Sequence, residues 1–237
     1  MNNNFDNYYE SCFSETRLQS VDQSFDTYER CFSGLLPNVK AAAILDFGAG
    51  LGNLTAWLER NGMSDIVSID ISRDQCEAAR KLGVNVKHIS NPLAFLKTKV
   101  DTFDVVFMSD VIEHLPKHEI IAYLRAMRAC LKENGYLVIK TENVATPTGI
   151  YQHHMDFTHE YNFVDKSLKQ VLLMSGFKDI MIIGHSMKWP KRPWLWWKPI
   201  VRMIYINLIK LIYAAEQPRG TNNPQIFSNS LIARALK

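Results

Sequence analysis

Short apolar runs alternate with helical patterns through the middle of this 237-residue chain. The runs are rich in β-branched residues: AILDF (43–47), IVSID (66–70), VNVKHI (84–89), FDVVFMS (103–109) and GYLVIKT (135–141). Apolar strands that are separated by amphipathic helices predict a parallel sheet covered by helices on both faces. The fold class is therefore expected to be α/β.

The clearest helical pattern lies between the fourth and the fifth predicted strands. Its apolar face consists of Ile120, Leu124, Met127 and Leu131. Pro116 at its start and Gly135 just past its end are typical of helix boundaries. We therefore predict one amphipathic helix that runs up to the fifth strand.

The C-terminal half continues the pattern. A helix is predicted in VDKSLKQVLLMSGF (164–177), with Asp165 as its cap and Gly176 at its end. KDIMIIGH (178–185) and FSNSLIARAL (227–236) are predicted to be two further strands.

The chain is long enough for one well-filled domain, and we expect a single domain over residues 1–237. One or two helices are predicted over 5–36. The expected parts are an N-terminal helical cap (1–40), a core (41–185), an aromatic and basic helical insertion (186–223) and a last strand (224–237).

Charge is spread unevenly along the chain. The chain has 27 Lys+Arg and 24 Asp+Glu, and this net charge of +3 is too small to indicate nucleic-acid binding. Residues 186–219 hold seven Lys/Arg and one Asp/Glu, a local +6, which leaves 20 basic and 23 acidic residues elsewhere.

The four cysteines form no C-x-x-C pair, and MNNNFDNYYE lacks the features of a signal peptide. We therefore expect a cytoplasmic enzyme.

A glycine-rich loop, ILDFGAGLGN, follows the first predicted strand. Gly48, Gly50 and Gly52 allow the backbone to turn sharply and to approach a ligand closely. Asp70 ends the next strand, where a carboxylate can accept both ribose hydroxyls of an adenosine. A dinucleotide site prefers G-x-G-x-x-G, whereas the third glycine comes one position early here.

The spacing G-x-G-x-G, with Asp46 two residues before the first glycine, resembles motif I of class I S-adenosylmethionine-dependent methyltransferases. The resemblance extends through IVSIDIS, D-V-I-E-H-L and L-K-E-N-G-Y-L-V-I, and it covers residues 43–143. It implies a Rossmann-like, doubly wound sheet of seven strands, mostly parallel, with the last strand antiparallel. It also implies S-adenosylmethionine as the cofactor.

The expected cofactor contacts follow from this resemblance. They are Asp46 for the methionine amino group, Gly48, Ala49, Gly50 and Gly52 for methionine and ribose, Asp70 for the ribose hydroxyls, Ile71 for adenine, and Ser109 and Asp110 beneath the sulfonium. Many members carry an acidic residue after strand three, whereas this chain has Ser90 and Asn91, which are the expected adenine contacts.

The segment HHMDFTHEYNF (153–163) follows the fifth strand, and ligands of open α/β sheets bind beyond the carboxyl ends of the strands. Three interpretations are open: a general base with Asp156 as its orienter, a structural tie of the loop, or a metal site of His153, His154, Asp156 and His159. We favour the base and expect no metal, because the sulfonium already supplies the leaving group. His114 is expected to fix the loop over the cofactor.

D-F-T-H-E-Y-N-F, followed by D-K-S-L-K-Q-V-L-L-M-S-G-F, resembles a pattern of methyltransferases from bacterial surface-polysaccharide synthesis. The resemblance implies His154, Asp156 and His159 as catalytic candidates, and a sugar hydroxyl of a glycan or glycan precursor as the acceptor. The alternatives are methylation of a small aromatic or quinone-like molecule and a non-catalytic adenosine-binding scaffold.

The insertion carries four of the five tryptophans and an apolar helix predicted over 200–215. This helix is too short and too charged to span a bilayer. A lid or dimer helix is the favoured interpretation, and peripheral contact of residues 189–213 with the inner face of the membrane is the alternative. Nucleic-acid binding is not expected, since no other part of the chain supports it.

Overall fold

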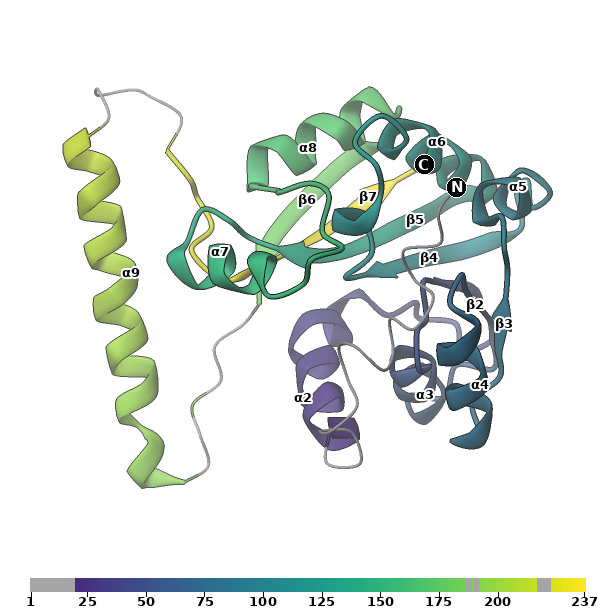
Figure 1. The fold of residues 1–237 in the computed structure, drawn as a ribbon, viewed down its shortest axis with the longest axis horizontal. Helices are drawn as coiled ribbons and strands as arrows, with labels where there is room; N and C mark the ends of the chain where they lie inside the picture. Colours follow the sequence, from purple (N-terminus) through teal and green to yellow (C-terminus); the bar gives the residue numbers. More distant parts are fainter. Residues whose placement is uncertain (1–19, 186–188, 190–191, 217–222) are drawn as a thin grey trace.

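Seven strands form one sheet in the order β3-β2-β1-β4-β5-β7-β6 (Figure 1). The structure is a computed structural model that describes residues 20–185, 189, 192–216 and 223–237. The strands are β1 (Ala43–Phe47), β2 (Asp65–Asp70), β3 (Val86–His88), β4 (Phe103–Ser109), β5 (Leu131–Glu142), β6 (Lys178–Gly184) and β7 (Ser230–Leu236). β1 to β5 pair in parallel, and β7 is antiparallel to both β5 and β6. The predicted Rossmann-like sheet is confirmed.

Helices cover both faces of the sheet (Figure 1). One face carries α2 (Ser20–Phe32), α3 (Asn53–Arg60) and α4 (Arg73–Lys81), and the other carries α5 (Pro92–Lys97), α6 (Ile120–Cys130) and α8 (Asp165–Met174). Alternate residues of each strand supply the two cores: Ile44 packs in the cluster that contains Trp57, and Leu45 packs in the cluster that contains Leu124. This alternation follows from the two-residue repeat of a strand.

The helix before β5 is shorter than predicted. α6 ends at Cys130, and Leu131 begins β5 by pairing with Phe103. Asn134 then takes a left-handed conformation with φ 63°, and the pairing register shifts before Val105 resumes it with Tyr136. The assignment of Leu131 to the helix and of Gly135 to the position just past its end was wrong, because strand pairing with β4 replaces the last helical turn.

The predicted cap of α8 is also corrected. The helix is capped by Val164, whose N–H donates to Ser167 Oγ at 3.0 Å, and Asp165 is the first helical residue. Asp165 instead accepts a hydrogen bond from the backbone of Gln225. Gly176, with φ 90°, follows the helix end as predicted.

The N-terminal prediction is confirmed for α2, which the short helix Ser33–Leu35 follows, whereas residues 5–19 lie outside the described part of the chain. Two further short helices are Ile112–His114 and Pro193–Leu195.

Two helices lie beyond the end of β5 and the start of β7: α7 (Pro147–His154) and, farther out, α9 (Trp197–Glu216) (Figure 1). The predicted helix 200–215 is therefore confirmed. Tyr213 ties α9 to the body of the protein, because its hydroxyl donates to the backbone oxygen of Ala145 at 3.3 Å and its ring meets Phe227. Within the described residues, no helix has the length and apolar character that crossing a bilayer requires.

Candidate active site

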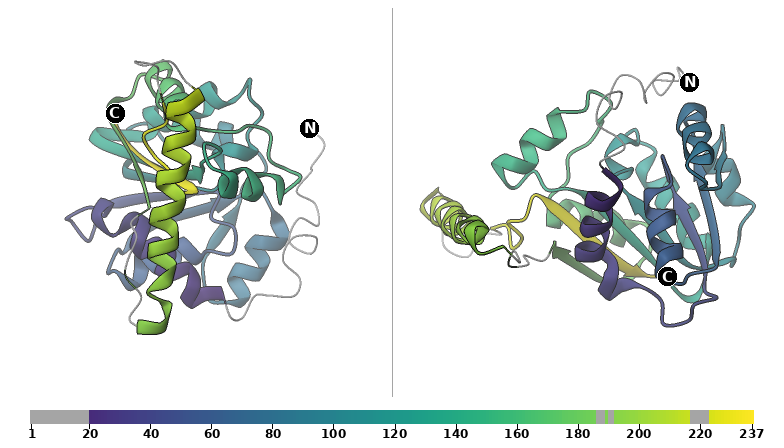
Figure 2. Two further views of the ribbon diagram at one scale, coloured as in Figure 1. Left: turned by 90° about the vertical axis from the view of Figure 1, so that its left-hand side faces the viewer. Right: turned by 90° about the horizontal axis from the view of Figure 1, so that it is seen from below.

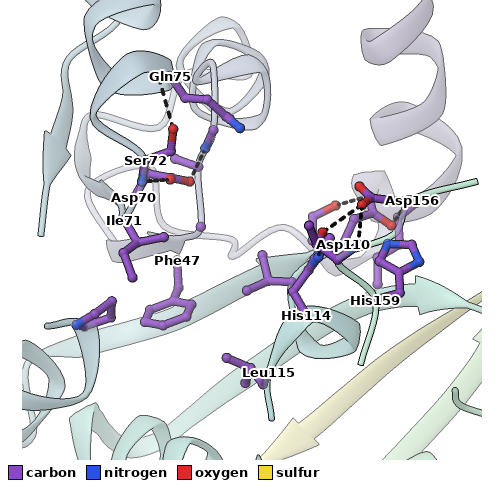
Figure 3. A pocket seen from close by; sticks show the side chains of 18 of the residues that line it. Phe47, Asp70, Ile71, Ser72, Gln75, Asp110, His114, Leu115, Asp156 and His159 are labelled. Atoms are coloured by element: carbon purple, nitrogen blue, oxygen red, sulfur yellow. Dashed lines mark hydrogen bonds and ion pairs between the residues drawn. The ribbon is translucent and has the colours of Figure 1, made fainter. Parts of the chain in front are cut away.

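A cavity of about 1000 Å³ opens at the carboxyl ends of the parallel strands. It lies where the chain order reverses between β1 and its neighbours β2 and β4, which is where open α/β sheets bind ligands. In Figure 3, Asp70 and Ile71 lie at one end of the cavity, and His114, Asp156 and His159 lie at the other. The cavity therefore has two chemically different halves.

The glycine loop forms the floor of the first half. Gly48 and Gly50 line the cavity with φ of 76° and 56°, a region that favours glycine. A Cβ on Gly48 would lie 2.4 Å from Val111, and one on Gly50 would lie 2.6 Å from Gln75 Oε1. Ala49 also lines the cavity, whereas Gly52 caps α3 and is not part of the lining.

Asp70 is held rigidly at the end of β2. Its two carboxylate oxygens accept from the backbone N–H groups of Gly50 at 2.8 Å and Ser72 at 2.7 Å. Burial raises the pKa of Asp70, although these hydrogen bonds oppose the shift. Since each oxygen keeps a second lone pair, the carboxylate can still accept from a ligand's hydroxyls.

Only some of the residues predicted to contact adenine line the cavity. Ile71 and Ser90 line the cavity as predicted, next to Pro92. Asn91 does not line it, because its side-chain oxygen accepts from Ala94 N at 3.0 Å and so caps α5. The sequence prediction missed this competing use of an asparagine before a helix.

Asp46 is almost fully buried at the end of β1 and lines the same half of the cavity. Burial raises its pKa to about 7, and the hydrogen bond from Thr55 Oγ1 at 2.7 Å opposes this only in part. Ser68 extends this hydrogen-bond network, because its hydroxyl bonds the hydroxyl of Thr55. A nearby cation would favour the ionised carboxylate.

Ser109 and Asp110 lie at the end of β4 and line the cavity. Ser109 Oγ donates to Asp110 at 3.1 Å, and Asp110 forms an ion pair with Lys140 of β5. Burial acts to lower the pKa of Lys140, but the Asp110 carboxylate outweighs it and the pKa is raised. This ion pair was not predicted from the sequence.

The second half of the cavity contains a hydrogen-bonded chain of three side chains. Thr158 Oγ1 donates to Asp156 Oδ1 at 2.7 Å, so it accepts from His114 Nδ1 at 2.8 Å. The neutral imidazole of His114 therefore carries its proton on Nδ1 and its lone pair on Nε2. Burial and the neighbouring His159 lower the pKa of His114 to about 4, so the ring is neutral at pH 7.

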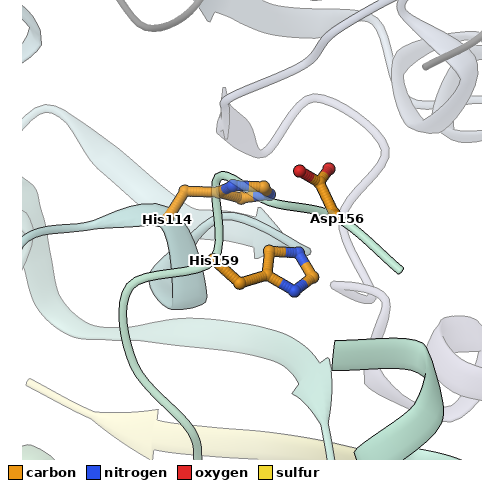
Figure 4. A group of neighbouring side chains, drawn as sticks. All are labelled: His114, Asp156 and His159. Atoms are coloured by element: carbon orange, nitrogen blue, oxygen red, sulfur yellow. The ribbon is translucent and has the colours of Figure 1, made fainter. Parts of the chain in front are cut away.

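A backbone oxygen, rather than a side chain, orients the ring of His159. Its Nδ1 lies 2.7 Å from the backbone oxygen of His153, which can only accept, so His159 donates from Nδ1. Glu142 Oε2 lies 3.6 Å from the same nitrogen. The ring centroids of His114 and His159 are 4.5 Å apart (Figure 4). Both rings donate from Nδ1, so the Nε2 atoms of two cavity-lining histidines lie in the same part of the cavity.

The loop after α7 contributes residues 155, 156 and 158–160 to the cavity lining. The backbone N–H groups of Glu160 and Tyr161 both donate to the oxygen of Glu113, at 2.7 and 3.2 Å. His114 also binds this loop through Thr158, so its predicted loop-fixing contact is present. His114 also lines the cavity.

The histidine cluster is divided by the structure. Asp156 and His159 line the cavity, whereas His154 is exposed at the end of α7, with its ring against His153 and outside the lining. His153 is buried and also outside the lining. We therefore withdraw His154 as a catalytic candidate, because successive residues of a helix point in different directions.

Among the residues that the structure describes, two groups of side chains could hold a cation: His114 with Asp156 and His159, and Glu142 with His153 and His159. The candidate ligand atoms of each group lie within 4.8 Å of one another. A cation bound through Nδ1 of His159 would have to replace the hydrogen bond that this nitrogen donates to the backbone oxygen of His153. The absence of a metal stays a prediction.

The first half of the cavity fits S-adenosylmethionine. Asp70 offers a carboxylate for ribose hydroxyls, Asp46 offers an ionisable carboxyl for an amino group, and the glycine loop lets the backbone approach without a Cβ. The volume of about 1000 Å³ leaves room for an acceptor beside the cofactor.

Comparison with known proteins agrees with this geometry. A family described as methyltransferase domain matches residues 22–182. N-terminal Xaa-Pro-Lys N-methyltransferase 1 of Homo sapiens is 32% identical over 106 residues, 43% of this chain and 47% of that protein. The chain thus spans about half the length of the curated relatives that it matches.

Two solved structures share the fold. A SAM dependent methyltransferase from Archaeoglobus fulgidus has a TM-score of 0.67 at 20% identity, with 97% of this chain and 98% of that chain covered. Phosphoethanolamine N-methyltransferase 2 of Haemonchus contortus, in complex with S-adenosyl-L-methionine, has a TM-score of 0.59 at 15% identity, covering 91% and 52%. Because the family match spans most of the fold and the cavity carries the cofactor-binding pattern, this chain belongs to the class I S-adenosylmethionine-dependent methyltransferases.

Proposed function

We propose that this methyltransferase acts on a sugar hydroxyl of a glycan or glycan precursor. One observation carries the proposal. The hydrogen-bonded side chains of His114, Thr158 and Asp156 line the same cavity as the glycine loop, and they orient a neutral imidazole that can accept a proton. A hydroxyl must lose a proton when it is methylated, so a base of this kind serves an oxygen acceptor.

The reaction balances with the residues present. S-adenosylmethionine supplies a methyl group on a sulfonium. The acceptor oxygen forms a bond to the methyl carbon, and the carbon–sulfur bond breaks with its electron pair going to sulfur. The acceptor proton passes to Nε2 of a histidine and then to water. Alignment of the acceptor with the methyl carbon accounts for much of the rate enhancement.

A base with a pKa of about 4 is strong enough for this step. As the acceptor oxygen gains the methyl group, its proton becomes far more acidic than that of an ordinary hydroxyl. The imidazolium that forms on His114 is then stabilised by Asp156 through Thr158. His114 therefore needs no positive shift of its pKa to act.

A sugar suits the polar character of the second half of the cavity. Lys140, Glu142 and Gln152 also line the cavity and carry donors and acceptors of the kind that bind hydroxyls. The D-x-T-H pattern at Asp156 to His159 adds support, because it resembles that of surface-polysaccharide methyltransferases.

An amine acceptor is the second candidate, favoured by the relative from Homo sapiens whose name specifies N-methylation. A neutral amine attacks without a base, but an ammonium must first lose a proton. The identity of the acceptor therefore requires a direct comparison of oxygen and nitrogen substrates.

The test is methyl transfer from labelled S-adenosylmethionine to a panel of sugar nucleotides and oligosaccharides, with amine-bearing peptides in parallel. Label on a sugar oxygen is the expected result, and label on the peptides alone would replace our proposal by the amine one. His114→Asn should lower kcat by about 10²- to 10⁴-fold. The affinity of this variant for S-adenosylhomocysteine should stay unchanged, because the substitution leaves the residues of the first half of the cavity in place.

Thr158→Val separates the orienting chain from simple loss of the base. This substitution removes the hydroxyl that joins His114 to Asp156. We therefore expect kcat to fall and the acid limb of the pH profile of kcat to shift. In the parent protein this limb should lie near pH 4, since His114 is protonated only below that pKa. His154→Asn, outside the cavity, is the matched control. Equal activity of all three variants would refute the assignment.

A further inference from the structure

α9 carries an apolar strip on its exposed side. The strip consists of Trp197, Ile200, Val201, Ile204, Leu208 and Leu211, which are between 49% and 66% exposed. Their spacing of three or four residues places them on one face of the helix. The opposite face meets the protein through the buried Ile209 and through Tyr213. Figure 2 shows α9 along one outer side of the molecule.

Tryptophans gather at the N-terminal end of this strip. Trp189, Trp194 and Trp196 are 51–69% exposed, and the rings of Trp189 and Trp196 are 6.3 Å apart. The fifth tryptophan, Trp57, is only 2% exposed in the core. Indole rings of this kind favour the boundary between water and lipid.

The charge around the strip is positive. Within residues 192–216 the basic residues are Arg192, Lys198, Arg202 and Lys210, and Glu216 is the only acidic residue. Arg192 lies over the Trp194 ring and Lys198 over the Trp197 ring. A second copy of this chain would place cations opposite cations, so an anionic partner fits better.

We propose that α9 lies in the interface of an anionic phospholipid membrane, with its apolar strip in the acyl boundary and its basic residues at the headgroups. A 20-residue helix with one apolar face and flanking cations is suited to this position. Apolar side chains in a continuous strip of this length indicate a binding surface. The inference does not depend on the identity of the methyl acceptor.

The position of α9 connects the membrane to the active site. Tyr213 binds Ala145, which lies two residues before α7, and the loop after α7 carries Asp156 and His159. That loop exposes two large apolar side chains, Met155 at 67% and Phe157 at 103%. Met155 also lines the cavity. Docking of α9 would therefore bring the acceptor half of the cavity close to the lipid surface.

The test is flotation of the full chain with vesicles of phosphatidylcholine alone or mixed with phosphatidylglycerol. We expect binding to the anionic vesicles, weakened by salt because the basic residues contribute. Ile204→Glu/Leu208→Glu should weaken binding at least about tenfold, since it places charges in the strip. Val39→Glu/Val100→Glu changes two equally exposed valines outside α9 and should bind like the parent protein.

Quenching of tryptophan fluorescence by brominated lipids gives a second readout on the parent protein. We expect quenching of the exposed indoles at a depth just below the headgroups. The proposal would be overturned if the parent protein failed to bind anionic vesicles or showed no quenching. It would also be overturned if light scattering found a dimer that Ile204→Glu/Leu208→Glu dissociates, because the strip would then bind a second copy.

Discussion

Cofactor binding should strengthen as the pH rises through 7, and Asp46 is the reason. Its side chain is 1% exposed at the end of β1, and burial raises its pKa to about 7. The amino group of the cofactor's methionine part carries a positive charge. If Asp46 faces this group, as the family resemblance implies, the ionised carboxylate binds the cofactor better than the protonated carboxyl.

The magnitude follows from the fraction of Asp46 that is ionised before binding. With a pKa of about 7, this fraction is about 0.09 at pH 6 and about 0.91 at pH 8. If only the ionised form binds, Kd falls about tenfold between these pH values, which equals about 1.4 kcal/mol. Binding should release about 0.9 protons at pH 6 and about 0.1 at pH 8.

Titration calorimetry with S-adenosylhomocysteine measures both quantities, provided that buffers of different ionisation enthalpy are compared at each pH. Asp46→Asn should bind more weakly and lose the pH dependence. Thr55→Val should move the transition to higher pH, because the hydroxyl of Thr55 stabilises the ionised carboxylate. A Kd that is flat from pH 6 to 8 in the parent protein would refute the reasoning. So would an unchanged pH dependence in Asp46→Asn.

Two further predictions concern the packing that supports the site. Gly149→Ala should lower the free energy of unfolding by more than about 2 kcal/mol, since its Cβ would lie 1.8 Å from Asn143 O. Gly34→Ala, with no neighbour within 4 Å, is its control, and equal melting temperatures would contradict the clash. Leu124→Ala should cost about 2–5 kcal/mol in denaturant unfolding, because Leu124 is fully buried. Leu173→Ala on the exposed side of α8 should cost under about 1 kcal/mol, and a similar loss in both variants would argue against the described core.

Local signals in the sequence were enough for the architecture and for most of the residues that line the first half of the cavity. Strand and helix repeats are read from neighbouring residues, so the α/β sheet and the apolar helix of residues 200–215 could be predicted. Asp70 could be predicted because it ends a strand beside the glycine loop. The boundary at Leu131 could not, because pairing with Phe103 of another strand decides it.

The acceptor half was decided only by the tertiary structure. The sequence places His154 close to Asp156, yet His154 lies outside the cavity lining, and His114 bonds Thr158, which is 44 residues away in the sequence. The tautomer of His114 depends on a partner that is distant in the sequence, and that of His159 depends on a backbone oxygen. Likewise, the repeat of α9 predicts an apolar face, but only the packing of Ile209 and Tyr213 determines which side stays exposed. Periodicity fixes what a segment can form, whereas the direction of a side chain depends on contacts that exist only after the chain has folded.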